Sequence, residues 1–313
     1  LLAAFASLYL GNRFAPPAPA APAIAPAQAP MPTAPNQASP LVQSVGSAPL
    51  NTEFATLTGA NADEVVSYLE NEFIRVEFTI FGGAIGNVAF MKYGLTKGSP
   101  LPFVFNQPRV QPMLAITDIP GLGPETAYRL VSATSSEVVY EAVLEGRLKV
   151  VRRFSLGYEM EGSDPYLIRH DTTLQDLSGN GAPQTVAALS LGTTSLISPN
   201  DYGQFLNIMS WDGEDEVLTK SGELEGGGFL AMVGVKDGAP KSSVTKDGTV
   251  VWAAAKNQFF SSIYTGDTAG FSTTTRRVEL PPFEGSSRAN KGLNGVVSYA
   301  MPAMAPGGAA VLG

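Results

Sequence analysis

An alternating segment at residues 71–93, NEFIRVEFTIFGGAIGNVAFMKY, limits the possible folds more than any other part of the chain. Across residues 74–80 apolar side chains occupy every second position, which is the period of a half-buried β-strand. Gly82 and Gly83 then interrupt the run, and glycine tolerates the positive φ of a tight reversal. The segment therefore predicts an antiparallel hairpin. Because a lone hairpin is marginally stable in water, its apolar face requires further strands.

The rest of the chain supplies further strand patterns, separated by Gly, Pro and Asp turns. No long segment has the 3.6-residue apolar period of an amphipathic helix. We therefore predict an all-β fold at residues 61–313, a sandwich of two large, mainly antiparallel sheets. Beyond the hairpin, we expect strands at 101–105, 113–116, 137–144, 148–156, 166–174, 185–191, 205–211, 229–235, 249–254, 259–265, 272–280, 295–301 and 309–312.

The N-terminal residues have a different composition. Residues 1–13 are mostly apolar and too few to span a bilayer, which takes about 20 residues, so we expect the C-terminal part of a transmembrane or signal-anchor helix. A short buried helix is the alternative. Residues 14–60 are rich in Pro and Ala, which predicts a disordered, partly extended linker.

Composition excludes several functions. The net charge of −8 and the scattered Lys and Arg argue against a nucleic-acid partner. Without cysteine there are no disulfides, no thiolate catalysis and no Cys-ligated metals, and the redox compartment stays undecided. Arg152-Arg153 and Arg276-Arg277 are adjacent pairs, and strand alternation would point the two members of each pair to opposite faces.

The sequence offers little chemistry, and we predict no catalytic, cofactor or metal site. His170 is the single histidine, so a two-histidine metal site or acid/base pair cannot form, and a packed or hydrogen-bonded histidine is favoured. The acidic run 211–216 lacks the ligand spacing of a helix-loop-helix calcium site, which favours a solvated loop over bound calcium. Trp211, Trp252 and Tyr264 suit either a sugar-stacking platform or the core, and the core is favoured.

Two motifs carry a family resemblance. Residues 71–88 follow N-x-F-x-x-V-x-F-x-x-x-GG-x-I-x-x-V, and residues 252–260 follow W-x-x-x-K-N-Q-F-F. With the apolar N-terminus and the linker, they resemble the periplasmic part of a YidC-type membrane protein insertase. The positions that carry the resemblance, taken as structural, are Gly82, Gly83, Trp252, Asn257, Gln258, Phe259 and Phe260.

The resemblance implies a β-supersandwich similar in fold to galactose mutarotases, placed between a first transmembrane helix and five helices encoded beyond residue 313. It implies a non-enzymatic domain without cofactor, in the periplasm at the bacterial inner membrane. The parent protein would insert and fold inner-membrane proteins, alone or with the Sec translocon. The implied partners are Sec subunits, nascent membrane proteins and the membrane itself.

Two other functions stay open. One is an exported mutarotase-like protein that acts on or binds carbohydrate. Mutarotation needs a positioned acid and base, which in that family are typically histidines plus a glutamate, so a single histidine counts against the enzyme. The other is a tethered binding or adhesion module with exposed sheet faces.

Overall fold

A computed structural model describes residues 66–107, 109–157, 164–226 and 239–313, all within one compact unit at residues 47–313. The predicted membrane helix at 1–13, the linker at 14–60 and the strand at 229–235 lie outside these residues. The three domain boundaries that the sequence indicates therefore stay predictions.

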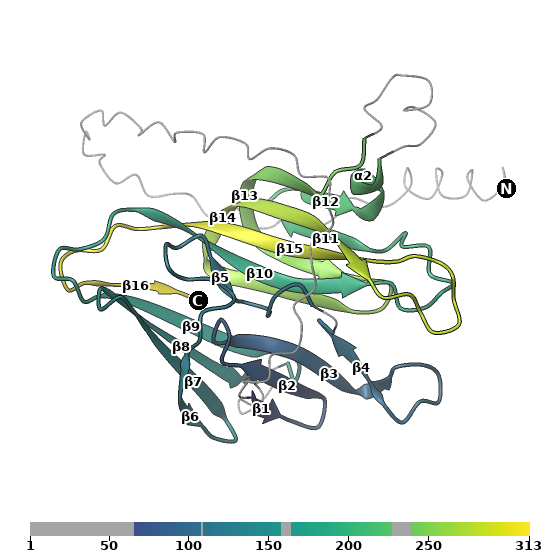
Figure 1. Ribbon diagram of the computed structural model, residues 1–313, viewed down its shortest axis with the longest axis horizontal. Helices are drawn as coiled ribbons and strands as arrows, with labels where there is room; N and C mark the ends of the chain where they lie inside the picture. The colour runs from purple at the N-terminus through teal and green to yellow at the C-terminus, as the bar shows by residue number, and fades with distance from the viewer. Residues whose placement is uncertain (1–65, 108, 158–163, 227–238) are drawn as a thin grey trace, which may run out of the picture. The chain divides into compact units, whose positions relative to one another are not determined.

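The predicted hairpin is present and forms the centre of a four-stranded antiparallel sheet (Figure 1). Its order is β1(Val66–Glu70), β2(Ile74–Thr79), β3(Ala84–Gly94) and β4(Pro102–Phe105). Gly82 and Gly83 both have positive φ, 72° and 51°, in the turn between β2 and β3. The reversal that the glycine pair predicts is confirmed.

A seven-stranded sheet forms the other layer (Figure 1). Its strand order is β12-β11-β13-β14-β15-β10-β5. The elements are β12(Glu216–Lys220), β11(Asn207–Trp211), β13(Ser243–Lys256), β14(Ser261–Leu280), β15(Asn290–Met301), β10(Thr185–Ser195) and β5(Ile116–Thr117), with one short helix, α2(Ser221–Glu225), after β12.

The third sheet has the order β16-β9-β8-β7-β6. Its elements are β16(Ala309–Leu312), β9(Ile168–Asp176), β8(Leu148–Leu156), β7(Glu137–Leu144) and β6(Arg129–Ala133). The sandwich is therefore confirmed as all-β and antiparallel, with one change: the layer that faces the seven-stranded sheet is divided into two sheets.

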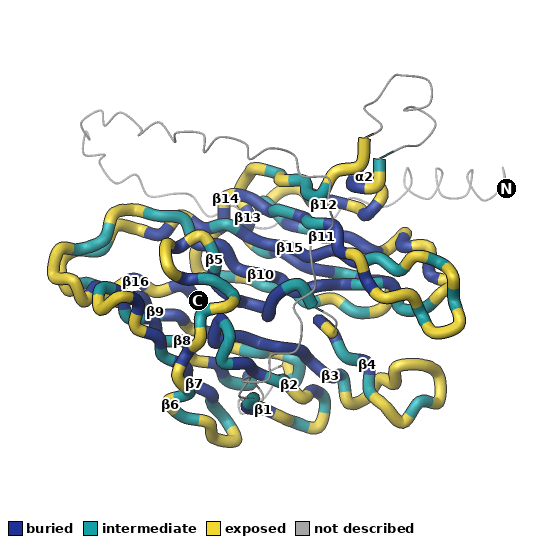
Figure 2. Tube along the Cα trace, viewed as in Figure 1, coloured by how far each residue is buried: buried dark blue, intermediate teal, exposed yellow. Residues whose placement is uncertain are grey.

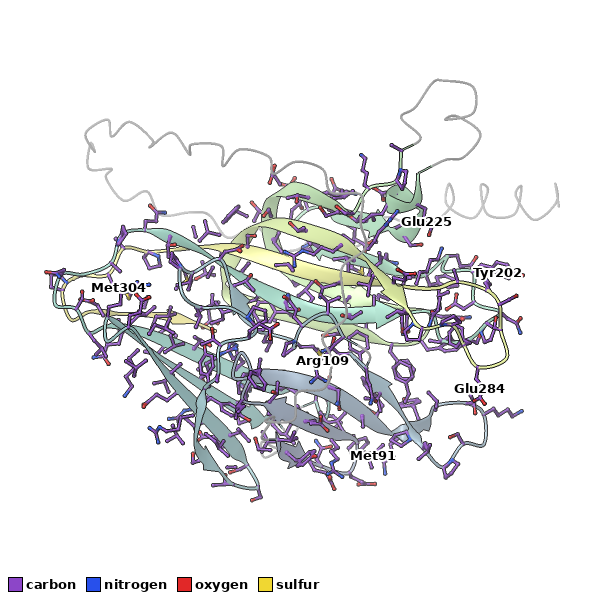
Figure 3. All side chains as sticks on the ribbon, in the orientation of Figure 1. Met91, Arg109, Tyr202, Glu225, Glu284 and Met304 are labelled. Carbon is purple, nitrogen blue, oxygen red and sulfur yellow. The ribbon has the colours of Figure 1, made fainter. Side chains whose placement is uncertain are left out.

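Apolar side chains from all three sheets meet in one core between the layers. Figure 2 colours the buried residues dark blue along the chain trace. The core includes Phe78 from β2, Phe154 from β8, Leu189 from β10 and Ile208 from β11. Side chains fill the space between the layers, where Arg109 lies (Figure 3). Burial of this apolar surface is the main force that holds the layers together.

The carboxylate of Asp176 joins the end of β9 to the loop before β16. It accepts hydrogen bonds from the backbone N–H of Ser178 (3.0 Å), Gly181 (2.9 Å) and Gly307 (3.0 Å), and from the hydroxyl of Ser178 (2.6 Å). These donors hold the pKa of Asp176 well below its usual range. The loop that delivers β16 to the sheet edge is thereby fixed.

Candidate functional site

Arg152 on β8 lies at the centre of the core and is fully buried. Its guanidinium donates to the carbonyl oxygens of Gly82 (2.8 Å) and Leu114 (2.6 Å) and to the hydroxyl of Thr172 (3.2 Å). No carboxylate among the described residues pairs with it, and burial lowers its pKa to about 10. Arg153 is exposed and pairs with Glu137 at 2.8 Å, so the predicted alternation of this arginine pair is confirmed.

His170 lies beside this guanidinium. Its Nε2 is 2.9 Å from Nη2 of Arg152 and 2.6 Å from Oγ1 of Thr172. An arginine nitrogen has only protons to donate, so Nε2 must accept and the ring proton must sit on Nδ1. Burial, and then the positive charge of Arg152, hold the pKa of His170 well below its usual range. The prediction of a packed, hydrogen-bonded histidine is confirmed, and this ring is closed to acid–base chemistry with an external ligand.

The acidic run 211–216 contains the turn between β11 and β12. The carboxylate of Asp212 accepts the backbone N–H of Glu214 and of Asp215, both at 2.7 Å. Glu216 already belongs to β12, which the sequence did not predict. No group of three potential metal ligands occurs among the described residues.

The sheet register separates the three aromatic residues of the suggested platform. Trp211 lies opposite Trp252, whereas Tyr264 lies opposite Ala253, so its side chain leaves the sheet on the other face. Tyr264 packs against Tyr299, with ring centroids 6.1 Å apart. A joint platform of all three side chains is therefore not formed.

The segment 257–260 is a tight turn between β13 and β14. Asn257 is buried, and its Oδ1 accepts the backbone N–H of Phe259 (3.1 Å) and of Phe260 (2.9 Å). Gln258 is exposed, and Phe259 is 70% exposed. The turn directs Phe260 toward β3 and β4.

An open cleft with a volume of about 860 Å³ lies where this turn meets the ends of β3 and β4. We call it the aromatic cleft. Its aromatic lining consists of Phe90, Tyr93, Phe103, Tyr166, Phe259 and Phe260.

Phe260 is at the centre of this lining. Its ring is stacked on Phe103 at 3.9 Å with an interplanar angle of 3°, and its centroid is 5.0 Å from Phe90 and 5.8 Å from Tyr93. Tyr166 lies 6.1 Å from Phe90 on another side. Rings that pack against one another in this way are held in place without a ligand. The aromatic cleft is therefore preformed.

The polar groups of the aromatic cleft are hydroxyls and amines. Serine and threonine hydroxyls, Lys92 and Lys97 line it, and no Asp, Glu or His occurs among the described lining residues. Burial, and then the neighbouring hydroxyl of Tyr93, raise the pKa of Tyr166. These groups suit binding of a hydroxylated ligand and do not form a carboxylate pair for hydrolysis.

Sequence reasoning found only part of this site. Phe259 and Phe260 were singled out as motif positions, whereas Phe90, Tyr93, Phe103 and Tyr166 were not. The available signal was local: aromatic residues in predicted strands that lie beside the Gly- and Pro-containing sequences 94–102 and 157–165.

Comparison with known proteins finds only distant structural similarity. No family model and no curated protein sequence matches the chain. A solved structure of a putative aldose 1-epimerase from Escherichia coli K12 is similar, with a TM-score of 0.46 and 10% identity over 80% of this chain and 97% of that one. A galactose mutarotase related enzyme from Lactobacillus acidophilus has a TM-score of 0.42 and 9% identity over 79% and 96%. A putative mutarotase from Salmonella typhimurium has a TM-score of 0.38 and 10% identity, over 84% of this chain and 94% of that one.

These findings correct the functional predictions. The resemblance to a YidC-type insertase is wrong, because the solved structures to which the chain is similar are described as epimerases and mutarotases. The Sec subunits, nascent membrane proteins and membrane implied as partners lose their basis with it. The described residues contain no helix with the length and apolar character needed to cross a membrane. The prediction that the chain is no enzyme is also contradicted, since its structural neighbours are described as enzymes. The periplasmic location stays a prediction.

Proposed function

We propose that this chain binds carbohydrate, and that the aromatic cleft is its binding site. The observation that carries the proposal is the preformed set of rings around Phe260, together with the exposed ring of Phe259 at the mouth. Aromatic rings offer flat apolar surface to the C–H faces of a sugar, while hydroxyl and amine groups hydrogen-bond its hydroxyls. Sugar-binding is one of the functions that the sequence left open.

The size and openness of the cleft favour a short oligosaccharide. Its volume of about 860 Å³ is more than a single hexose requires. Typical small-molecule sites occupy about 300–1,000 Å³, so the cleft lies near the upper end of that range.

Saturation-transfer NMR with galactotetraose and maltotetraose tests the proposal. We expect the strongest transfer to the ring C–H protons that would face the aromatic side chains. Phe259→Ala removes an exposed ring without disturbing the core, and we expect about tenfold weaker binding. Phe271→Ala is the matched control, because Phe271 is 42% exposed and does not line the cleft. Absence of binding, or equal loss in both variants, refutes the proposal.

Mutarotation is a second candidate, favoured by the hydroxyls of Tyr93 and Tyr166, which both line the aromatic cleft. Opening a pyranose ring breaks the C1–O5 bond, with one group taking the anomeric hydroxyl proton and another giving a proton to O5. In a concerted relay one tyrosine hydroxyl accepts the anomeric proton while it passes its own proton to the other, which protonates O5, so that neither tyrosine becomes charged. Exchange between the anomers of galactose, followed by ¹H NMR, should be faster with the wild type than in buffer and slower with Tyr93→Phe. Equal rates with and without protein exclude this activity.

A further inference from the structure

The charged side chains that line the aromatic cleft have the opposite sign to the net charge of the chain. The full sequence has a net charge of −8, yet the charged residues that line the cleft, within the described part of the chain, are Lys92 and Lys97. Local charge of one sign in a cleft attracts ligands of the other sign. The two lysines differ in whether their ammonium groups already have partners within the protein.

Lys92 is engaged within the protein. Its ammonium forms an ion pair with Glu72 and lies 5.3 Å from the ring centroid of Phe73. The nearby carboxylate of Asp164 is also engaged, since its Oδ1 accepts the backbone N–H of Tyr166 at 2.9 Å. Neither carboxylate forms an ion pair with Lys97 in the part of the chain that the structure describes.

Lys97 is exposed, and no ion pair or hydrogen bond to its ammonium occurs among the described residues. Its backbone position is fixed by a turn in which the N–H of Ser99 donates to the carbonyl of Thr96 at 3.0 Å. Gly98 has a φ of 82°, and a left-handed residue at the third position is typical of a type II turn. The turn thus fixes the backbone of a residue that lines the cleft and whose ammonium has no partner among the described residues.

From this juxtaposition we infer that the aromatic cleft takes an acidic oligosaccharide, one that carries uronic-acid carboxylates, and that Lys97 pairs with a carboxylate. The inference deepens the proposed function and rests on it. A single ammonium matches one negative charge. Recognition of phosphate commonly uses the arginine fork, and no arginine is among the lining residues that the structure describes.

Titration calorimetry with tetragalacturonate and galactotetraose tests the inference. We expect the wild type to bind the acidic tetramer more tightly at about 20 mM NaCl and to lose this preference as salt screens the charge. Lys97→Gln should weaken binding of tetragalacturonate by about fivefold at low salt, the value of a favourable exposed ion pair, and leave galactotetraose unchanged. Lys97→Arg should restore the preference. Lys241→Gln is the control, because Lys241 is an exposed lysine that does not line the cleft.

The outcomes separate the two proposals. If neither tetramer binds, the proposed carbohydrate function itself fails. If both bind equally, or if Lys97→Gln has no effect on the acidic one, only the inference fails. Tighter binding of galactose 6-phosphate than of monomeric galacturonate also overturns it, because the cleft would then be selective for phosphate.

Discussion

Gly83 in the β2–β3 turn should not accept any side chain. Its φ of 51° lies in the left-handed region, and a Cβ there would be 2.7 Å from Cγ and 2.8 Å from Cδ1 of Tyr128. Tyr128 is only 3% exposed, so its ring cannot swing away into solvent. Gly83→Ala therefore meets both a backbone cost and a steric cost.

Each of the two costs has a typical magnitude. The left-handed conformation costs an L-residue about 1–2 kcal/mol. Overpacking against a fixed ring typically adds about 1–3 kcal/mol. We expect the free energy of unfolding of Gly83→Ala to fall by about 3 kcal/mol, which for a domain of this size lowers the melting temperature by about 6–12 °C.

Urea unfolding, followed by the fluorescence of Trp211 and Trp252, measures this loss as a lower midpoint at constant slope. Gly98→Ala is the matched control, because Gly98 has a φ of 82° and no atom lies within 4 Å of the position that a Cβ would take, which leaves only the backbone cost of about 1 kcal/mol. A Tyr128→Leu background should relieve the steric part. Equal losses in the two glycine variants, or no relief in that background, would refute the steric explanation.

Two further predictions concern His170 and Asn257. Because the folded protein keeps His170 neutral while an unfolded chain protonates it near pH 6.5, stability should fall as the pH drops below about 6.5, by at most about 1.4 kcal/mol per pH unit, and be insensitive to this group above that. His170 is the single histidine, so the fall in urea midpoint between pH 7 and 5 that it causes should be absent in His170→Phe. An unchanged pH dependence in that variant would contradict the neutral state of His170 in the folded protein. Asn257→Ala leaves the backbone N–H groups of Phe259 and Phe260 without their acceptor and should destabilise by about 1–3 kcal/mol. Thermal melting measures the loss of stability in Asn257→Ala. The control is Gln258→Ala at the exposed neighbouring position, for which we expect a change of under about 0.5 kcal/mol. Similar losses in the two variants would exclude the capping role of Asn257.

Strands with one buried and one exposed face could be predicted well. The predicted strands 137–144 and 148–156 coincide with β7 and β8, because their apolar and polar residues alternate and Glu145-Gly146 supplies two positive φ values in the turn. The fold class follows from such segments. The hairpin at 71–93 is the clearest of them.

Other elements lack this signal. β14 is one continuous strand, whereas the sequence predicted two, because Gly266 and Gly270 look like breaks. Neither glycine has positive φ; both make close backbone approaches that a side chain would obstruct. The predicted strand 113–116 is mostly a loop with an isolated bridge at Met113. The strands β6 and β12 were not predicted at all.

The aromatic cleft could not be predicted from local sequence patterns, for a different reason. Its rings come from β3, β4, the segment before β9 and the β13–β14 turn, which are far apart in the sequence. Only the pairing of β3 with β4 is local enough to infer. The stack of Phe103 on Phe260 depends on how the two layers are arranged, which no single segment encodes.

The late arrival of β16 at the edge of β9 has a consequence for synthesis. Asp176 and its partner Gly307 are 131 residues apart, so β9 leaves the ribosome long before the strand that covers it. Through that interval its outer N–H and C=O groups are unpaired, and a second nascent chain presents a competing edge. On a polysome with closely spaced ribosomes, the rate of elongation through residues 177–308 therefore sets how long the edge of β9 can pair with a neighbouring nascent chain.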